Sequence, residues 1–272
     1  MTFTVDQVPL LVTRRIESLT ADLPDGYSEI LRHLLNNEAK MLRPTLTFLA
    51  GNAISYSSVP EPADESELMV YSPDNYLVDA ATAIELTHIS SLYHDDIIDQ
   101  DDFRRGVESA NKKFGVGKAL IAGDYLFAMA LELTEHIGNR ATQTLIKAFR
   151  KMCYGQIYEI TREIETMDQY YELIDHKTVA LIEGAVELGL IAVSPLPAES
   201  EFFSKWLNFA QNFGRAFQIA DDRRDNPELL QKVGVNDSQL QNYLDRAQSA
   251  ASKLSNPRTE VELQHLIDKI SK

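Results

Sequence analysis

Apolar residues recur every three or four positions along most of this chain of 272 residues, and runs that alternate between apolar and polar residues are scarce. The three-to-four spacing gathers apolar side chains on one face of an α-helix, whereas a half-buried β-strand requires alternation. The pattern therefore predicts an all-α bundle. The longest helices are predicted over residues 119–137, 141–167, 170–193, 201–225 and 240–254.

The composition argues against several classes of function. The net charge of −15 suits nucleic acid poorly, because binding to backbone phosphates requires a basic face. The single cysteine, Cys153, excludes an internal disulfide and a zinc site of several cysteines, and it fits a reducing compartment. No apolar run reaches the roughly 18 residues of a membrane span, and the N-terminus lacks the pattern of a signal peptide. We therefore expect no nucleic-acid partner, no integral membrane span and a cytoplasmic location.

Two clusters of aspartates each close an apolar helical segment. Asp95 and Asp99 stand four residues apart and therefore share a helix face, and Asp221 and Asp225 repeat this spacing. Two partly buried carboxylates about 6 Å apart repel each other by ~3 kcal/mol at an effective dielectric constant near 20. A hard divalent cation would relieve this repulsion, and Mg²⁺ prefers carboxylates, water and substrate phosphates. Neutralisation of the clusters by the arginine pairs at 104–105 and 223–224 is the alternative.

Basic residues occur where a phosphorylated substrate could meet these acids. Lys40 and Arg43 lie three residues apart at the start of a predicted helix, Arg104 and Arg105 follow the first acidic cluster, and Lys177 interrupts an apolar helix. Arginine suits the planar fork of a phosphate, and lysine supplies a point charge. Taken singly, each basic group is equally typical of a solvated surface.

Together these motifs resemble the trans-isoprenyl diphosphate synthases, also called the polyprenyl synthetase family. Residues 95–99 with the trailing Arg104-Arg105-Gly106 are similar to the first Asp-rich motif, and Phe217-Gln218 followed by residues 221–225 is similar to the second. Further similarities lie at residues 38–44, 122–126, 155–156 and 177–178, and all the motifs occur in the family's order.

The resemblance implies a single domain over residues 1–272, an all-α bundle of long, mostly antiparallel helices around a central cavity, which is the isoprenoid synthase fold. It implies a Mg²⁺-dependent prenyltransferase that condenses isopentenyl diphosphate with an allylic diphosphate to give an all-trans polyprenyl diphosphate. In the family the second motif leads into a further stretch and more helices. We therefore expect the domain to be shortened after residue 225. A homodimer is expected because family members are usually dimers.

The resemblance also implies a role for each matching residue. The diphosphate of isopentenyl diphosphate would be held by Lys40, Arg43, His88 and Arg105. Mg²⁺ would be held by Asp95, Asp99 and Asp221, with Asp96, Asp222 and Asp225 as neighbours or water-mediated ligands. The allylic substrate would face Arg104, Lys177, Thr178 and Gln218. Catalysis would depend most on Asp95, Asp99, Asp221, Lys177 and Arg104.

Product length in this family depends on a tunnel along the helix that carries the first acidic motif. Ser90 and Ser91 lie five and four residues before Asp95, about 6–7.5 Å away along a helix, and Thr87 lies one turn further back. Short-chain enzymes place aromatic residues at this first gate. Small residues here predict an open tunnel and a product of twenty carbons or more.

Three other functions compete with an independently active synthase. The altered motifs and the shortened end favour a non-catalytic or partner-dependent subunit of a hetero-oligomeric synthase. A terpene cyclase or squalene-type synthase would ionise the same diphosphates, but Lys40, Arg43 and His88 form a site for a second diphosphate that a cyclase does not need. A helical interaction module without an active site would require both acidic clusters to be accidental.

Overall fold

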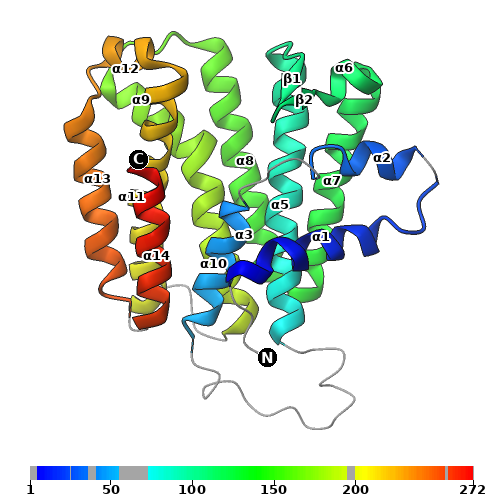
Figure 1. The fold of residues 1–272 in the computed structure, drawn as a ribbon, viewed down its shortest axis with the longest axis horizontal. Coiled ribbons are helices and arrows are strands. Elements are labelled where there is room, and N and C mark those ends of the chain that lie inside the picture. The colour runs from blue at the N-terminus through cyan, green and yellow to red at the C-terminus, as the bar shows by residue number, and fades with distance from the viewer. Residues whose placement is uncertain are drawn as a thin grey trace, which may run out of the picture.

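A computed structural model describes residues 5–24, 26–35, 41–54, 73–194, 200–254 and 257–271. It confirms the predicted all-α bundle, and its long helices run side by side (Figure 1). The front half contains the 3-10 turn η1 (Val5–Gln7) and the helices α1 (Val8–Leu19), α2 (Tyr27–Arg32), α3 (Leu42–Asn52), α5 (Pro73–Ile98), α6 (Ala110–Phe114) and α7 (Val116–Ile137). The back half contains α8 (Asn139–Thr161), α9 (Met167–Ile174), the π-helical turn η3 (Asp175–Val179), α10 (Ala180–Val193), α11 (Glu201–Asp225), α12 (Pro227–Val233), α13 (Asp237–Ala251) and α14 (Pro257–Ile270).

Helix α10 lies at the centre of the bundle and contacts α3, α5, α8 and α11. Its sequence is apolar on nearly every side, as expected for a helix that is enclosed by others. Gly189 permits the closest of these contacts, because a Cβ atom at this position would lie 2.1 Å from the carbonyl oxygen of Thr47 on α3. None of the helices in the described ranges is long and apolar enough to cross a bilayer.

Two of the predicted helices differ from the structure. The segment predicted over 141–167 stops at Thr161, and a new helix, α9, begins after Thr166. Thr166 and Gln169 form a capping box there, in which each side chain accepts a hydrogen bond from the backbone of the other residue. The segment predicted over 170–193 is continuous, but it contains the π-helical turn η3. Apolar spacing alone indicates neither the capping box at Thr166 nor the extra residue in η3.

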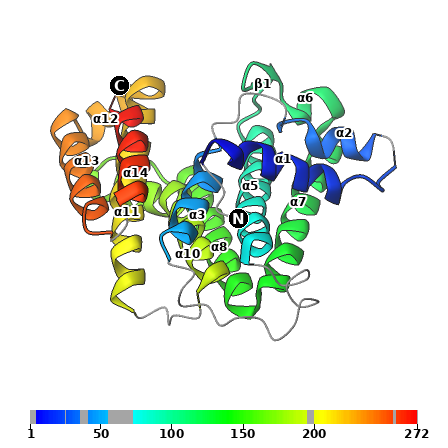
Figure 2. The same ribbon diagram turned by 60° about the horizontal axis from the view of Figure 1, so that its bottom comes forward.

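Three helices follow the second acidic cluster. Helix α12 begins directly after α11, with Asn226 as its N-cap, and α13 returns along α11. The last helix, α14, contacts α3, α11 and α13 (Figure 2). Helices α12, α13 and α14 therefore close one side of the bundle around α11.

A short antiparallel hairpin follows α5, with strands β1 (Phe103–Arg104) and β2 (Val107–Glu108). The two turn residues, Arg105 and Gly106, have φ values of 51° and 77°. Positive φ at both central positions is typical of a two-residue hairpin turn of type I′. The hairpin lies at the end of the bundle where α5 terminates (Figure 1).

Candidate active site

The first acidic cluster lies at the C-terminal end of α5. Asp95 is half-buried, and burial raises the pKa of its carboxyl to about 6, with Lys177 opposing the rise and Asp99 adding to it. Asp99 is exposed just beyond the helix, and its backbone N–H donates to the carbonyl oxygen of Asp95 at 2.8 Å. Ionising Asp95 at neutral pH therefore costs free energy, which a neighbouring cation would offset.

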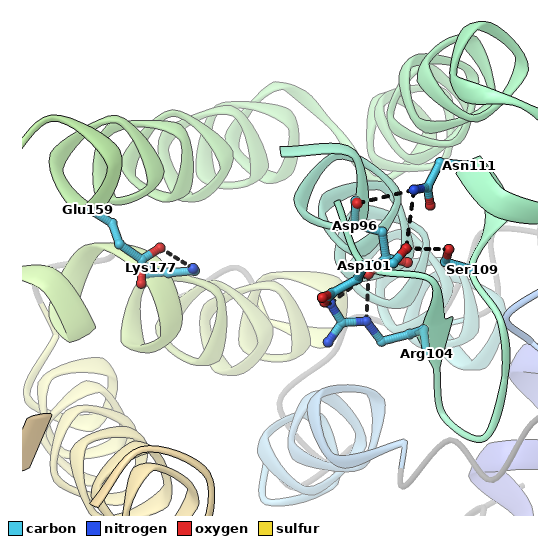
Figure 3. Close-up of polar contacts among 7 residues, drawn as sticks. All are labelled: Asp96, Asp101, Arg104, Ser109, Asn111, Glu159 and Lys177. Carbon is cyan, nitrogen blue, oxygen red and sulfur yellow. Dashed lines mark hydrogen bonds and ion pairs between the residues drawn. The ribbon is translucent and has the colours of Figure 1, made fainter. Parts of the chain in front are cut away.

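Asp96 has a different environment from Asp95, because it is fully buried beneath the hairpin. Arg104 donates from Nε to Asp96 Oδ1 at 2.6 Å and from a terminal nitrogen to Asp101 at 2.9 Å (Figure 3). Ser109 and Asn111 donate to the backbone oxygen of Asp101, so the loop after α5 is bonded from both sides. The structure thus places Asp96 against Arg104 and leaves Asp95 and Asp99 for a ligand.

The basic residues of the front half gather beside this cluster. Arg105, at the tip of the hairpin, donates to the carbonyl oxygen of Leu34 at 3.2 Å and lies 3.4 Å from Nε2 of His88. Burial and the nearby arginines Arg43 and Arg105 hold the pKa of His88 well below its usual range, so its imidazole is neutral at pH 7. A neutral ring can accept the hydrogen bond from Arg105 and help to orient the guanidinium.

Arg43, the second residue of α3, completes this basic group. Burial lowers the pKa of its guanidinium to about 10, and Arg105 lowers it further whereas Glu85 raises it. The Nε atom of Arg43 is buried without a hydrogen-bond partner in the described ranges. Two neighbouring cations, one of which has an unused buried donor, favour an anionic ligand. Lys40, which was assigned to the same group from sequence, lies outside the described residues.

Glu85 belongs to this basic group although sequence reasoning did not select it. Its side chain is only 2% exposed, and burial raises the pKa of its carboxyl while Arg105 and Arg43 lower it. The sequence contained a signal, because Glu85 precedes His88 by three residues and therefore lies on the same side of α5. A buried carboxylate near two arginines offsets part of their charge.

The π-helical turn η3 carries Lys177 and Thr178. Lys177 forms an ion pair with Glu159 on α8, a residue that the sequence analysis also missed (Figure 3). Gly155 allows α8 to approach this turn, because a Cβ atom there would lie 2.7 Å from the backbone nitrogen of Lys177. Single π-helical turns are frequent at functional sites, and this one places a lysine beside the end of α8.

The second acidic cluster ends α11 and is bonded to the π-helical turn. Thr178 donates to Gln218 Oε1 at 2.6 Å, and Gln218 donates from Nε2 to Asp222 Oδ1 at 2.9 Å. The hydroxyl of Tyr170 donates to the other oxygen of Asp222 at 2.6 Å. Asp222 is thereby held by Gln218 of its own helix and by Tyr170 of α9, and burial raises its pKa against these hydrogen bonds.

The other two aspartates of this cluster lie nearer to solvent. Asp221 is half-buried and paired with Arg224, while Asp225 is exposed at the last residue of α11. Glu159 raises the pKa of both Asp95 and Asp222, which are on different helices. One aspartate of each acidic cluster therefore lies close enough to Glu159 to be affected by its charge.

A cavity of about 330 Å³ lies between α5, α7 and α8, next to Asp95 of the first acidic cluster. Asp95 and Lys177 are its charged lining residues, and most of the rest of its wall is apolar. Phe149 lines the cavity and stacks on Phe127 of α7, with ring centroids 3.7 Å apart. The remaining lining residues are Ser91, His94, Ile97, Ile98, Leu120, Met152, Cys153, Gln156, Ile157 and Ile160.

The three residues assigned to product length occupy different places. Ser91 lines the cavity, and its hydroxyl donates to the carbonyl oxygen of His88 at 2.8 Å. Ser90 and Thr87 are fully buried and are not part of the cavity wall. Thr87 donates to the carbonyl oxygen of Ala83 at 2.8 Å. Among these three, only Ser91 therefore meets a ligand in the cavity directly.

The donor chemistry at the end of the cavity fits Mg²⁺. Asp95, Asp99 and Asp221 carry carboxylate oxygens, the ligands that hard divalent cations prefer, and Asp95 lies in the cavity wall. Burial raises the pKa of Asp95 even with Lys177 nearby, so a further cation beside this carboxylate would favour its ionised form. Within the described ranges, no three acidic, histidine or cysteine side chains stand close enough to form a metal site by themselves. A cation held here would need oxygen atoms from water and from a phosphorylated ligand as well.

Comparison with known proteins places the chain in a family. Residues 24–260 match the sequence model of the polyprenyl synthetase family. The chain is 33% identical to nonaprenyl diphosphate synthase of Mycobacterium tuberculosis over 72% of its own length and 54% of that protein's. It is 35% identical to heptaprenyl diphosphate synthase component 2 of Geobacillus stearothermophilus, over 76% of its own length and 60% of that protein's.

The fold agrees with solved structures as well. A geranyltranstransferase from Thermotoga maritima superposes with a TM-score of 0.81 at 25% sequence identity, and the match covers 98% of each chain. The family match spans both acidic clusters, the hairpin, the π-helical turn and all the lining residues of the cavity. On these grounds the chain belongs to the polyprenyl synthetase family.

Proposed function

We propose that this protein is a Mg²⁺-dependent prenyltransferase that condenses isopentenyl diphosphate with an allylic diphosphate to give an all-trans polyprenyl diphosphate of twenty carbons or more. The observation that carries the proposal is the apolar cavity with Asp95 and Lys177 among its lining. An allylic diphosphate has the same two parts, an apolar tail and a polyanionic head. The names of the mycobacterial and Geobacillus relatives, both polyprenyl diphosphate synthases, support the same activity.

The allylic head would lie between the two acidic clusters. Asp95, Asp99 and Asp221 would hold Mg²⁺ there, and the ion would supply Lewis-acid stabilisation of the leaving diphosphate. Lys177 contributes a further positive charge, and Arg104 holds the loop that follows Asp99. Such groups accelerate ionisation because they stabilise charge that grows in the transition state.

The second substrate would bind through the basic group of Arg43, Arg105 and neutral His88. Isopentenyl diphosphate needs no ionisation, so its head requires cations and hydrogen-bond donors to hold it. Its double bond attacks the allylic cation, and a proton then leaves the new product. Apolar side chains around the bound tail would limit the access of water to the cation, which would otherwise be captured as an alcohol.

The direct test is an elongation assay with the purified protein, Mg²⁺, farnesyl diphosphate and labelled isopentenyl diphosphate. A longer labelled chain is expected on chromatography, and a chelator should remove it. Absence of any elongated product, together with absence of diphosphate binding by calorimetry, would refute the proposal and favour a helical interaction module.

Binding can be measured without turnover through Cys153, which is exposed and lines the cavity. It is the only cysteine of the chain, so a maleimide labels one site. Burial raises the pKa of the thiol, and labelling should therefore be followed at mildly alkaline pH. We expect farnesyl diphosphate with Mg²⁺ to slow labelling at least about tenfold, because the tail covers the sulfur. Equal rates with and without the ligand would exclude the tail from this cavity.

A homodimer remains part of the proposal. Exposed apolar side chains on α7, with Ile121 at 64% and Val116 at 56% exposure, offer a surface for a second copy. Such a patch favours association because apolar surface leaves water. Sedimentation equilibrium should give twice the chain mass, and Ile121→Lys should shift it toward the monomer. A monomer at micromolar concentration would contradict this assignment.

A partner-dependent synthase is the second candidate. It is favoured by the 35% identity to a protein named as component 2 of a heptaprenyl diphosphate synthase. The same site would then become active only after a second protein binds. Elongation that appears on mixing with such a protein, and is absent from the isolated chain, would decide for this candidate.

A further inference from the structure

Gln156 places a buried amide in the wall of the apolar cavity, and this amide makes no hydrogen bond within the described part of the chain. It lies on α8 and is 9% exposed. Within the described part of the chain, neither its Oε1 nor its Nε2 atom has a hydrogen-bond partner. It shares the lining of the cavity with Asp95 and Lys177, the residues nearest the proposed allylic head.

An unpaired amide at such a position is costly. Buried polar groups are nearly always hydrogen-bonded, and a side chain with both amide atoms unpaired requires an explanation. The neighbouring cavity residues Met152, Ile157 and Ile160 show that apolar side chains are accommodated on this face of α8. A glutamine retained there indicates a polar ligand group that the folded chain does not supply.

Other neutral oxygens near the site are already engaged. Thr178 donates its hydroxyl hydrogen to Gln218 Oε1, and Gln218 donates in turn to Asp222. Neither Thr178 nor Gln218 lines the cavity. These hydrogen bonds position Asp222, so the amide of Gln156 is the uncommitted carbonyl dipole on the cavity wall.

We propose that Gln156 is a catalytic residue whose amide carbonyl stabilises the allylic cation. This inference rests on the proposed function. The carbon–oxygen bond of the allylic diphosphate breaks, and its electron pair leaves with the diphosphate. The positive charge spreads over the allylic carbons until the double bond of isopentenyl diphosphate supplies the pair for the new carbon–carbon bond. A proton then leaves to the released diphosphate.

A neutral amide suits this task better than a carboxylate. Its carbonyl oxygen presents partial negative charge to a cation, yet it neither takes up a proton readily nor competes with the aspartates for a divalent metal ion. A dipole fixed in a site from which water is excluded acts more strongly than the same dipole in water. The Nε2 group is left to donate toward the departing diphosphate.

The test compares Gln156→Leu, which keeps the approximate volume, with Gln143→Leu as a matched control. Gln143 is an exposed glutamine of α8 that bonds only to Asn139. We expect Gln156→Leu to lower kcat at least tenfold, with an unchanged or higher Tm because two unpaired groups are removed. Gln143→Leu should leave kcat unchanged. A Gln156→Leu variant with normal kcat, or one whose kcat and Tm fall together, would overturn the proposal.

A binding experiment separates this inference from the proposed activity. The probes are an analogue with a protonated nitrogen at the carbon that becomes cationic and an uncharged thio analogue, each with Mg²⁺. Gln156→Leu should weaken binding of the cationic analogue at least tenfold and binding of the uncharged analogue less than twofold, since only the first analogue mimics the charged state. Equal weakening of both would assign Gln156 to packing. An inactive wild-type protein that still shows the selective loss would contradict the proposed function alone.

Discussion

Asp95→Asn should slow chain elongation by about 10³-fold or more, because in the proposed mechanism it removes a charge that would hold Mg²⁺ where the leaving diphosphate gathers negative charge. The raised pKa of Asp95 shows that its ionised form is disfavoured in the folded protein. The neutral asparagine should therefore leave Tm unchanged or raise it. Steady-state elongation rates and thermal unfolding of the same preparation measure both effects.

The matched control is Asp245→Asn on α13. Asp245 is exposed and accepts a hydrogen bond from Gln241, remote from the cavity lining. The elongation rate of Asp245→Asn should equal that of the wild-type protein. If Asp95→Asn kept even a tenth of the wild-type rate at saturating Mg²⁺, the first acidic cluster would not hold the leaving group.

Phe149→Ala should lengthen the product by one or more isoprene units. Phe149 is the lining residue of α8 furthest from Ile160, a span of eleven residues or ~16 Å along the helix. Its ring stacks on Phe127 at an interplanar angle of 20°, which holds the Phe149 ring in place at this end of the cavity. Removing one ring opens space for the growing tail. Reversed-phase chromatography of the dephosphorylated products measures the change.

Ser91→Phe is the counterpart of this variant, because it adds a ring to the cavity wall instead of removing one. It should shorten the product, whereas Phe202→Ala, on α11 and away from the cavity lining, should leave the distribution unchanged. An unaltered product from both Phe149→Ala and Ser91→Phe would show that the tail grows along another path.

Much of the fold follows from the sequence because the helices are long and their ends are marked. The helix predicted over 201–225 has these bounds in the structure, where Ser200 caps its start and Asn226 follows its end. The hairpin escaped prediction because two residues per strand are too few to show alternation. The π-helical turn escaped because an inserted residue changes the hydrogen bonding without interrupting the apolar spacing.

The charged residues that gather at the candidate site could be predicted from the sequence. Acidic clusters and basic pairs stand out in a sequence, and the structure brings Arg43, His88 and Arg105 together although they are distant along the chain. Glu159 was missed because a single acid among 41 carries no signal until its neighbours are known, whereas the three-residue spacing of Glu85 to His88 could have indicated Glu85. Gln156 was noticed only as part of a dipeptide. Its burial with both amide atoms unpaired is a property of the folded chain, which no spacing rule reports.

The turn η3 sets the rotational phase between the helices that it joins. Each α-helical residue advances the chain by about 100° around the axis. The extra residue in η3 therefore rotates α9 by about that angle relative to α10. Deleting a single residue between Asp175 and Val179 would restore uniform winding. Four neighbouring helices hold α10 in place, so the rotation would displace α9 instead. It would move the Tyr170 hydroxyl away from Asp222. The spacing within this short segment is therefore as strict a requirement as the identity of its lysine.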